Sequence, residues 1–157
     1  MAAPHLSSMF EVEKDWIDYN GHMNMAYYTV LFDRAADELF LEMKMGPDYA
    51  LQRRLTIYTA EIHLSYIREL HLGHRVRVSS RLLDHDEKRL HLYQEIHHED
   101  GWLAAACECM SLHVDMNGPK VSPFPHDIAS IIETMQREHA DLPPPERAGR
   151  SISIARR

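Results

Sequence analysis

The chain has 157 residues, of which 45% are hydrophobic and 26% charged, and its formal net charge is −7 at pH 7. This length and composition predict one soluble globular domain spanning residues 1–157. The negative charge argues against a nucleic-acid partner, and no apolar run is long enough to predict a signal peptide or a membrane span. The two cysteines form no C-x-x-C motif, which favours a reducing cytoplasm.

The first third of the chain predicts a short strand and then one long helix. Residues 10–14 are expected to form the strand. The helix is expected from about Met25 to Met45, because Asn24 is a good N-cap and apolar residues then recur every three or four positions. Gly46-Pro47 predicts its end. The apolar stripe, which requires burial against a sheet, consists of Tyr28, Leu31, Phe32, Ala35, Leu39 and Met43, widened by Ala36 and Phe40.

The middle of the chain predicts an antiparallel meander. Strands are expected at residues 56–69, 76–82, 90–96 and 102–116. A polar turn at 84–87 and hairpin signals at 100–101 and 117–118 separate or close them. Alternation in the first strand places five residues on one face: Tyr58, Ala60, Ile62, Leu64 and Tyr66. One long helix before such strands predicts an α+β fold, in which a curved antiparallel sheet wraps around the helix.

The last part of the chain predicts a C-terminal helix and a basic tail from about residue 125. The helix is expected at about 127–137, and Leu142-Pro143-Pro144-Pro145 cannot continue it. The basic residues of the tail are Arg147, Arg150, Arg156 and Arg157.

The segment from Trp16 to Asn24 carries the strongest functional signal. It brings the Asp18 carboxylate, a turn at Gly21 and the start of the long helix within a few residues. A carboxylate can act as nucleophile or general base, and the first free N–H groups of a helix can stabilise an oxyanion. Together they form a minimal acyl-transfer site. Spacing alone leaves open that Asp18 is a loop residue, Gly21 a turn residue and Asn24 an ordinary cap.

The pattern Asp18-x-x-Gly21-His22-x-Asn24, followed by Tyr27-Tyr28 and Phe32-Asp33, resembles the signature of hotdog-fold acyl-CoA thioesterases of the 4-hydroxybenzoyl-CoA thioesterase type. The resemblance extends over roughly residues 8–128. It implies the hotdog fold, hydrolysis of an acyl-CoA thioester and a homo-oligomer, a dimer or tetramer, with sheets joined edge to edge. It also assigns catalysis to Asp18 and the oxyanion donor to the backbone near Met25.

Several site roles stay open at this stage. His22 either orients Asp18 or the thioester, or is a buried histidine with its own partners. Asn24 is expected to cap the helix and also to contact substrate. Glu61 is a second candidate acid, whose alternative is a solvated strand position.

The sequence gives no sign of a metal or of a separate cofactor. The twelve histidines include no H-E-x-x-H and no paired Cys/His spacing, so no zinc site is expected. No G-x-S-x-G elbow and no Gly-rich phosphate loop are present. Coenzyme A would enter as part of the substrate, and the candidates for holding its phosphates are Arg53, Arg54, Arg68, Arg75, Arg77, Lys88 and Arg89.

Two other functions remain possible from the sequence: a hotdog hydratase or dehydratase, and a non-catalytic acyl-CoA-binding module. Asp18 and His22 have three residues between them, whereas the hydratase signature has four. The segments 16–22 and 59–69 are also similar to thioesterases associated with carnitine breakdown, which include betainyl-CoA hydrolases. A trimethylammonium acyl group would suit aromatic faces, with Glu61 as counter-charge; the candidates, otherwise core residues, are Trp16, Tyr27, Tyr58 and Tyr66. A short aliphatic or aromatic acyl-CoA is the competing substrate.

Overall fold

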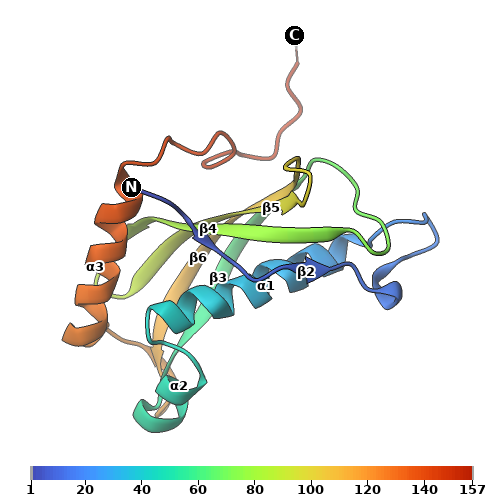
Figure 1. Ribbon diagram of the computed structural model, residues 1–157. Coiled ribbons are helices and arrows are strands. Elements are labelled where there is room, and N and C mark those ends of the chain that lie inside the picture. Colours follow the sequence, from blue (N-terminus) through green and yellow to red (C-terminus); the bar gives the residue numbers. More distant parts are fainter. Residues whose placement is uncertain (1, 157) are drawn as a thin grey trace.

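The computed structural model describes residues 2–156, and Figure 1 shows a long helix lying against a curved sheet. A short 3-10 helix, Lys14–Trp16, precedes the long one. The helices are α1 (Met25–Glu42), α2 (Pro47–Arg53) and α3 (His126–Ala140). The strands are β1 (His5–Leu6), β2 (Phe10–Glu11), β3 (Leu55–Tyr66), β4 (Arg75–His85), β5 (Arg89–His98), β6 (Leu103–Asp115) and β7 (Lys120–Val121).

The sheet is antiparallel throughout, with strand order β1-β4-β5-β6-β3; β2 also pairs with β4 and β7 with β6. The predicted α+β arrangement is confirmed, as are the four long strands and their short turns. Within residues 2–156, β3 pairs only with β6, so its other side is a free edge of the sheet. None of the described helices is both long and apolar enough to cross a membrane.

Helix α1 begins where the sequence predicts and ends three residues earlier. Asn24 caps it, since the side chain accepts a hydrogen bond from the Ala26 N–H. The six residues of the predicted stripe are buried, whereas Ala36 and Phe40, which were expected to widen it, are only partly buried and line a groove beside the helix. The helix stops at Glu42, and the chain turns through Lys44 with a φ of 60°. Gly46-Pro47 does not only stop a helix: it starts the unpredicted α2, where proline occupies the first turn and needs no hydrogen-bond acceptor.

The prediction that Tyr58 shares a face with Ile62 and Leu64 is wrong. A β-bulge in β3 lies between Thr59 and Glu61, where the register with β6 shifts. Because side chains alternate across a strand, one extra residue moves all later side chains to the opposite face. Ile62 and Leu64 therefore face α1, whereas Tyr58 pairs with Leu112 on the outer face.

The first predicted strand, residues 10–14, is also shorter than expected. Only Phe10 and Glu11 pair with β4, and β1 supplies a second short pairing. The chain then leaves the sheet through the 3-10 helix, which places Trp16 in the core with 5% of its surface exposed. Val12 is fully buried, as the alternation of apolar residues in this segment predicts. The strand pairing ends at Glu11 because its partner, Arg75, is the first residue of β4.

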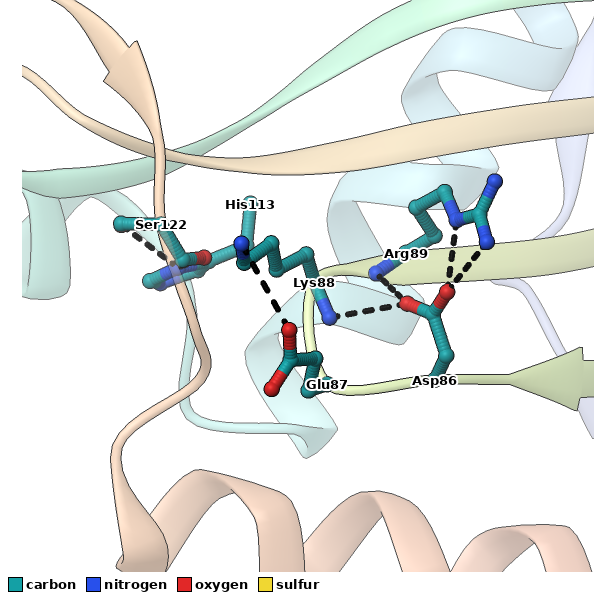
Figure 2. Close-up of polar contacts among 6 residues, drawn as sticks. All are labelled: Asp86, Glu87, Lys88, Arg89, His113 and Ser122. Atoms are coloured by element: carbon teal, nitrogen blue, oxygen red, sulfur yellow. Dashed lines mark hydrogen bonds and ion pairs between the residues drawn. The ribbon is translucent and has the colours of Figure 1, made fainter.

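The turn between β4 and β5 is shorter than predicted, because β4 extends to His85. Figure 2 shows Asp86 at its centre. Asp86 Oδ1 accepts hydrogen bonds from the N–H groups of Lys88 (2.9 Å) and Arg89 (2.8 Å), and Oδ2 accepts from Arg89 Nε at 2.7 Å. The neighbouring Lys88 Nζ lies 3.5 Å from the Glu87 carboxylate. The carboxylate thus closes the hairpin and also neutralises the charge of Arg89.

Helix α3 covers one end of the sheet, and the tail after it returns over the outer face (Figure 1). Helix α3 is three residues longer at its C-terminal end than predicted. Arg81 Nη1 donates to Pro143 O at 2.6 Å, and the Gly149 N–H donates to Glu108 Oε2 at 2.7 Å. These contacts fasten the first part of the basic tail; its last residue, Arg157, lies outside the described residues.

The core has two parts that meet along α1. One surrounds the first half of α1 and includes Trp16, Met23 and Leu31. The other joins the end of α1 to α2 and α3, and Leu39 lies in it with no exposed surface. Helix α1 therefore stabilises both parts through a single stripe of side chains.

We expect Leu39→Ala to lower the free energy of unfolding by about 2–5 kcal/mol, because it removes a buried side chain and leaves a cavity. Urea unfolding followed by circular dichroism measures the change. Leu51→Ala is the matched control: Leu51 is 77% exposed on α2, and we expect a change below about 0.5 kcal/mol. Equal effects of the two substitutions would contradict this picture of the core.

Candidate active site

The loop before α1 folds back on itself and returns Asp18 to the helix start. The Asp18 N–H donates to His22 O at 3.2 Å, and the Gly21 N–H donates to Asp18 O at 3.0 Å. Gly21 has a φ of 82°, a conformation that glycine adopts without strain. The Asn24 N–H then donates to Trp16 O at 2.9 Å, which closes the loop. The tight turn explains why a glycine stands between Asp18 and the helix.

The Asn24 carboxamide joins the carboxylate to the helix. Its Oδ1 accepts from the Ala26 N–H at 3.0 Å, and its Nδ2 donates to Asp18 Oδ2 at 2.9 Å. The other carboxylate oxygen of Asp18 accepts from the Asn20 N–H at 2.8 Å. Both oxygens of a half-buried carboxylate are therefore held by donors.

These contacts lower the pKa of Asp18 below its usual value. The hydrogen bond from Asn24 is the largest cause, the Asn20 N–H follows, and the charge of His22 adds a smaller contribution. Each favours the ionised form, so Asp18 is an anion at neutral pH. An ionised carboxylate suits a nucleophile or a general base, and it does not suit a general acid.

The first N–H group of α1 is free. The Ala26 N–H is used by the cap, and the Tyr27 N–H donates to Asn24 O at 3.1 Å. The Met25 N–H has no hydrogen-bond acceptor within residues 2–156. Because the N-terminus of a helix carries partial positive charge, this N–H is suited to an oxygen that gains negative charge.

A groove of about 810 Å³ runs along α1 from Ala26, between the helix and the inner faces of β3 and β6. Most of its lining is apolar. It also contains two carboxylates, Asp33 and Asp37, and no lysine, arginine or histidine side chain. Because Ala26 lines one end, the groove begins next to the free N–H of Met25.

His22 lies in the loop without touching the Asp18 carboxylate by a hydrogen bond. Its Nδ1 is shielded from solvent and has no partner among the described residues, and its ring meets the edge of His71 at 6.0 Å between centroids. Asn24, and not His22, orients Asp18. The proposed role of His22 on the thioester stays a prediction.

None of the four aromatic candidates lines the groove. Trp16 stacks on Tyr27 at 5.6 Å between centroids, and the Arg34 guanidinium lies 5.2 Å from the Trp16 ring. Tyr58 lies on the outer face. Tyr66 is beside the helix start, where its hydroxyl donates to Met25 O at 3.1 Å. Tyr66 is thus the one member of the set that contacts the proposed oxyanion region.

The structure places Glu61 away from Asp18 within one chain. Glu61 pairs with Met110 on the outer face of the sheet, whereas α1 and the groove lie against the inner face. Within one chain, Glu61 and Asp18 therefore do not share a site.

Most of the basic candidates for CoA phosphates already have acidic partners. Arg53 pairs with Asp127 at 2.8 Å, Arg75 with Glu99 at 3.4 Å and Lys88 with Glu87 at 3.5 Å. Arg89 is held by Asp86. The guanidinium of Arg68 lies instead 4.1 Å from the Trp102 ring, at the same end of the molecule as Tyr66.

Cys107 and Cys109 are free thiols that line the floor of the groove. Burial raises the pKa of the Cys107 thiol to about 12, so this thiol is protonated at neutral pH and is a poor nucleophile. Among the described residues, no three His, Cys, Asp or Glu side chains are placed to hold a metal ion.

Comparison with known proteins places this arrangement in a family. Residues 12–132 match the thioesterase-like superfamily. A betainyl-CoA thioesterase from Pseudomonas aeruginosa is 35% identical over 141 residues, which cover 89% of each chain. An L-carnitine dehydrogenase/betainyl-CoA thioesterase from Rhizobium meliloti is 34% identical over 93% of this chain and 29% of its own length. A Staphylococcus aureus protein solved in complex with CoA superposes with a TM-score of 0.90 and 27% identity over 98% of each chain.

The chain belongs to the thioesterase-like superfamily. The predicted hotdog fold is confirmed, and the molecule is an acyl-CoA thioesterase by family and by its relatives. The family does not decide which residues of the thioesterase perform the reaction, so the roles of Asp18, His22, Asn24, Met25 and Glu61 stay predictions.

The sequence reasoning missed Asp33 and Asp37 of the thioesterase. The sequence does show that Asp33 and Asp37 are four residues apart on the helix and that Asp33 belongs to the family signature. What was not visible is that their side of α1 forms the wall of a groove, because that depends on where β3 and β6 pass.

We expect Asn24→Ala to raise the pKa of Asp18 toward its ordinary value, because the substitution removes the hydrogen bond that contributes most to the lowered pKa. A carbon-13 NMR titration of the Asp18 carboxyl group measures the pKa. The helix also loses its cap, which costs about 1 kcal/mol of stability.

Asn20→Ala is the control for this titration, since it keeps the backbone N–H that binds Asp18 and removes only the smallest contribution, that of the Asn20 side chain. A pKa of Asp18 that is the same in wild type and Asn24→Ala would contradict the bridging role of Asn24.

Proposed function

We propose that Asp18 attacks the thioester carbonyl carbon or activates the water that does so, and that the Met25 N–H stabilises the oxyanion. The observation that supports this most is the Asn24 carboxamide, which holds an ionised carboxylate beside a free helix N–H. In the direct route the carboxylate oxygen forms a mixed anhydride, the C–S bond breaks and the CoA thiolate leaves. Water then hydrolyses the anhydride and restores Asp18.

The electrostatics support a base or nucleophile over an acid. The hydrogen bonds to Asp18 stabilise its anion, so its proton is lost well below neutral pH. The same family match favours hydrolysis over the hydratase alternative and over a module that only binds. An assay that follows release of free thiol from acyl-CoA separates these functions, because only hydrolysis releases CoA.

Asp18→Asn is expected to lower kcat by at least about 100-fold, the scale of a lost nucleophile or general base. The free-thiol assay measures kcat, and circular dichroism checks the fold. Glu61→Gln is the paired variant, and it is expected to keep kcat near wild type because Glu61 faces the outer side of the sheet. The opposite pattern, an active Asp18→Asn and an inactive Glu61→Gln, would make Glu61 the catalytic residue.

The substrate we propose is a short acyl-CoA whose acyl group is cationic, of which betainyl-CoA is the example in the relatives' names. The groove supports the cationic group because its only charged side chains are carboxylates. It also keeps the CoA phosphates out, since anions would meet like charge there. The acyl group would therefore lie in the groove and the nucleotide outside it.

We also propose that two chains associate along β3. The free edge of this twelve-residue strand exposes backbone donors and acceptors, and such an edge is usually covered. Part of the groove wall is β3, so a second chain at this edge would enclose the groove and shield the acyl group from water.

Light scattering at micromolar protein is expected to give at least the mass of two 18.3 kDa chains. Ile62→Pro, on the edge strand, is expected to shift the mass toward one chain, because proline cannot donate to a pairing strand. Since proline also strains its own strand, Ile62→Ala serves as the control for side-chain loss. A monomeric wild type would overturn this proposal.

A further inference from the structure

We propose that Asp33 and Asp37 are the residues that select a positively charged acyl group. This inference rests on the proposed function, in which the groove along α1 takes the acyl part of the substrate. It concerns how the site discriminates between acyl groups and not how the thioester is broken.

Both carboxylates lie on the groove side of α1. Thr29, Asp33 and Asp37 follow one another at four-residue steps, so they form one row along the helix. All three line the groove. The opposite side of the same helix carries Leu31, Ala35 and Leu39, which are fully buried against the sheet. Asp33 and Asp37 therefore lie on a different side of α1 from its fully buried residues.

Neither carboxylate has a cation of its own. Some acids of the molecule pair with basic groups, as Glu13 does with Arg34 at 3.3 Å, but no ion pair within residues 2–156 involves Asp33 or Asp37. The pKa of Asp37 is raised, first by burial and then by the negative charge of Asp33. A bound cation would offset the repulsion between the two carboxylates and stabilise the ionised form of Asp37, since it supplies opposite charge.

The Gln94 side chain adds a partial negative charge to the same groove. Gln94 is only 4% exposed and lines the groove floor. Both hydrogen bonds of its carboxamide within the described residues are donated by Nε2, to Phe32 O and Ser80 Oγ. Its oxygen, Oε1, accepts no hydrogen bond from these residues, so the negative end of the amide dipole is available to attract a positively charged ligand in the groove.

The rest of the lining favours an alkylated cation over a primary ammonium. Apolar side chains from both walls, among them Phe40, Ile62 and Leu64, line the same space. A quaternary ammonium donates no hydrogen bonds, so it needs only apolar contact for its methyl groups and opposite charge nearby. The aromatic alternative is weaker, because Tyr27 and Arg34 already lie against the Trp16 ring.

The order along α1 distinguishes the two carboxylates. Asp33 is about 12 Å along the helix axis from Met25 and Asp37 is one turn further, and helix side chains lean toward the N-terminus. A short acyl group whose carbonyl lies at the Met25 N–H therefore presents its charge to Asp33 first. A four-carbon acyl chain also ends nearer to Asp33 than to Asp37, so Asp37 acts on the bound cation from a longer distance.

The test compares acyl groups that differ only in charge. Betainyl-CoA and 3,3-dimethylbutanoyl-CoA have the same shape, with nitrogen replaced by carbon. Wild type is expected to prefer the cation in kcat/KM by at least about fivefold, and each of Asp33→Asn and Asp37→Asn to reduce that preference by about twofold to fivefold, the range of exposed charge pairs. Asp33→Asn should have a larger effect than Asp37→Asn on both betainyl-CoA and 4-(trimethylammonio)butanoyl-CoA, because both cations lie nearer to Asp33. The double variant should lose the preference.

Glu38→Gln is the control for net charge, because Glu38 is on the same helix but holds the Ser8 N–H at 2.7 Å outside the groove. Its charge preference should match wild type. A wild type without charge preference, or a preference that both Asp variants retain, would overturn the assignment. So would a loss in Glu38→Gln as large as in the Asp variants.

Binding is measured separately, so that failure of the proposed function does not leave this proposal undecided. Calorimetry would use the two CoA thioethers in which CH₂ replaces the carbonyl group, one ending in trimethylammonium and the other in tert-butyl. If no acyl-CoA is hydrolysed but the cationic thioether binds more tightly and Asp33→Asn removes the difference, the thioesterase mechanism fails and the selectivity stands. Equal binding of the two thioethers would overturn the selectivity.

Discussion

The carboxamide of Asn24 is the interaction on which the site depends. Its oxygen binds the helix and its nitrogen binds Asp18, so a single planar group fixes the distance and angle between the carboxylate and the start of α1. The turn at Gly21 lets the chain return far enough for this contact to form. If the carboxamide were absent, the helix would lose its cap and the carboxylate would lose the donor that contributes most to its lowered pKa.

One side of helix α1 packs in the core, and another side lines the groove of the candidate site. One side buries Leu31, Ala35 and Leu39 and connects both parts of the core. Another side forms a groove wall with two carboxylates that make no ion pair within residues 2–156. The negative charge of Asp33 acts on Asp37 and raises its pKa, so a cation bound in the groove would be attracted by both. The buried stripe supplies the stability that makes this arrangement possible.

The bulge in the edge strand β3 determines which of its side chains line the groove. Its bulge near Glu61 turns Ile62 and Leu64 inward and leaves Tyr58 and Glu61 on the outer face. An inner wall of aliphatic side chains results, and Tyr66 reaches the helix start from the end of the same strand. The extra residue in the bulge therefore places Tyr58 on the face opposite Ile62 and Leu64, although strict alternation predicts one shared face.

Local patterns in the sequence determined a large part of this protein. Helix α1, its cap Asn24 and the four long strands depend on periodicity and on contacts between near neighbours, and the Asp18 signature identified the family. Tertiary structure alone decided the rest. The bulge in β3 arises from pairing with β6, a strand about fifty residues further along the chain. The groove that makes Asp33 and Asp37 neighbours of a ligand exists only where α1 passes over β3 and β6, a contact between segments distant in the chain that no local pattern encodes.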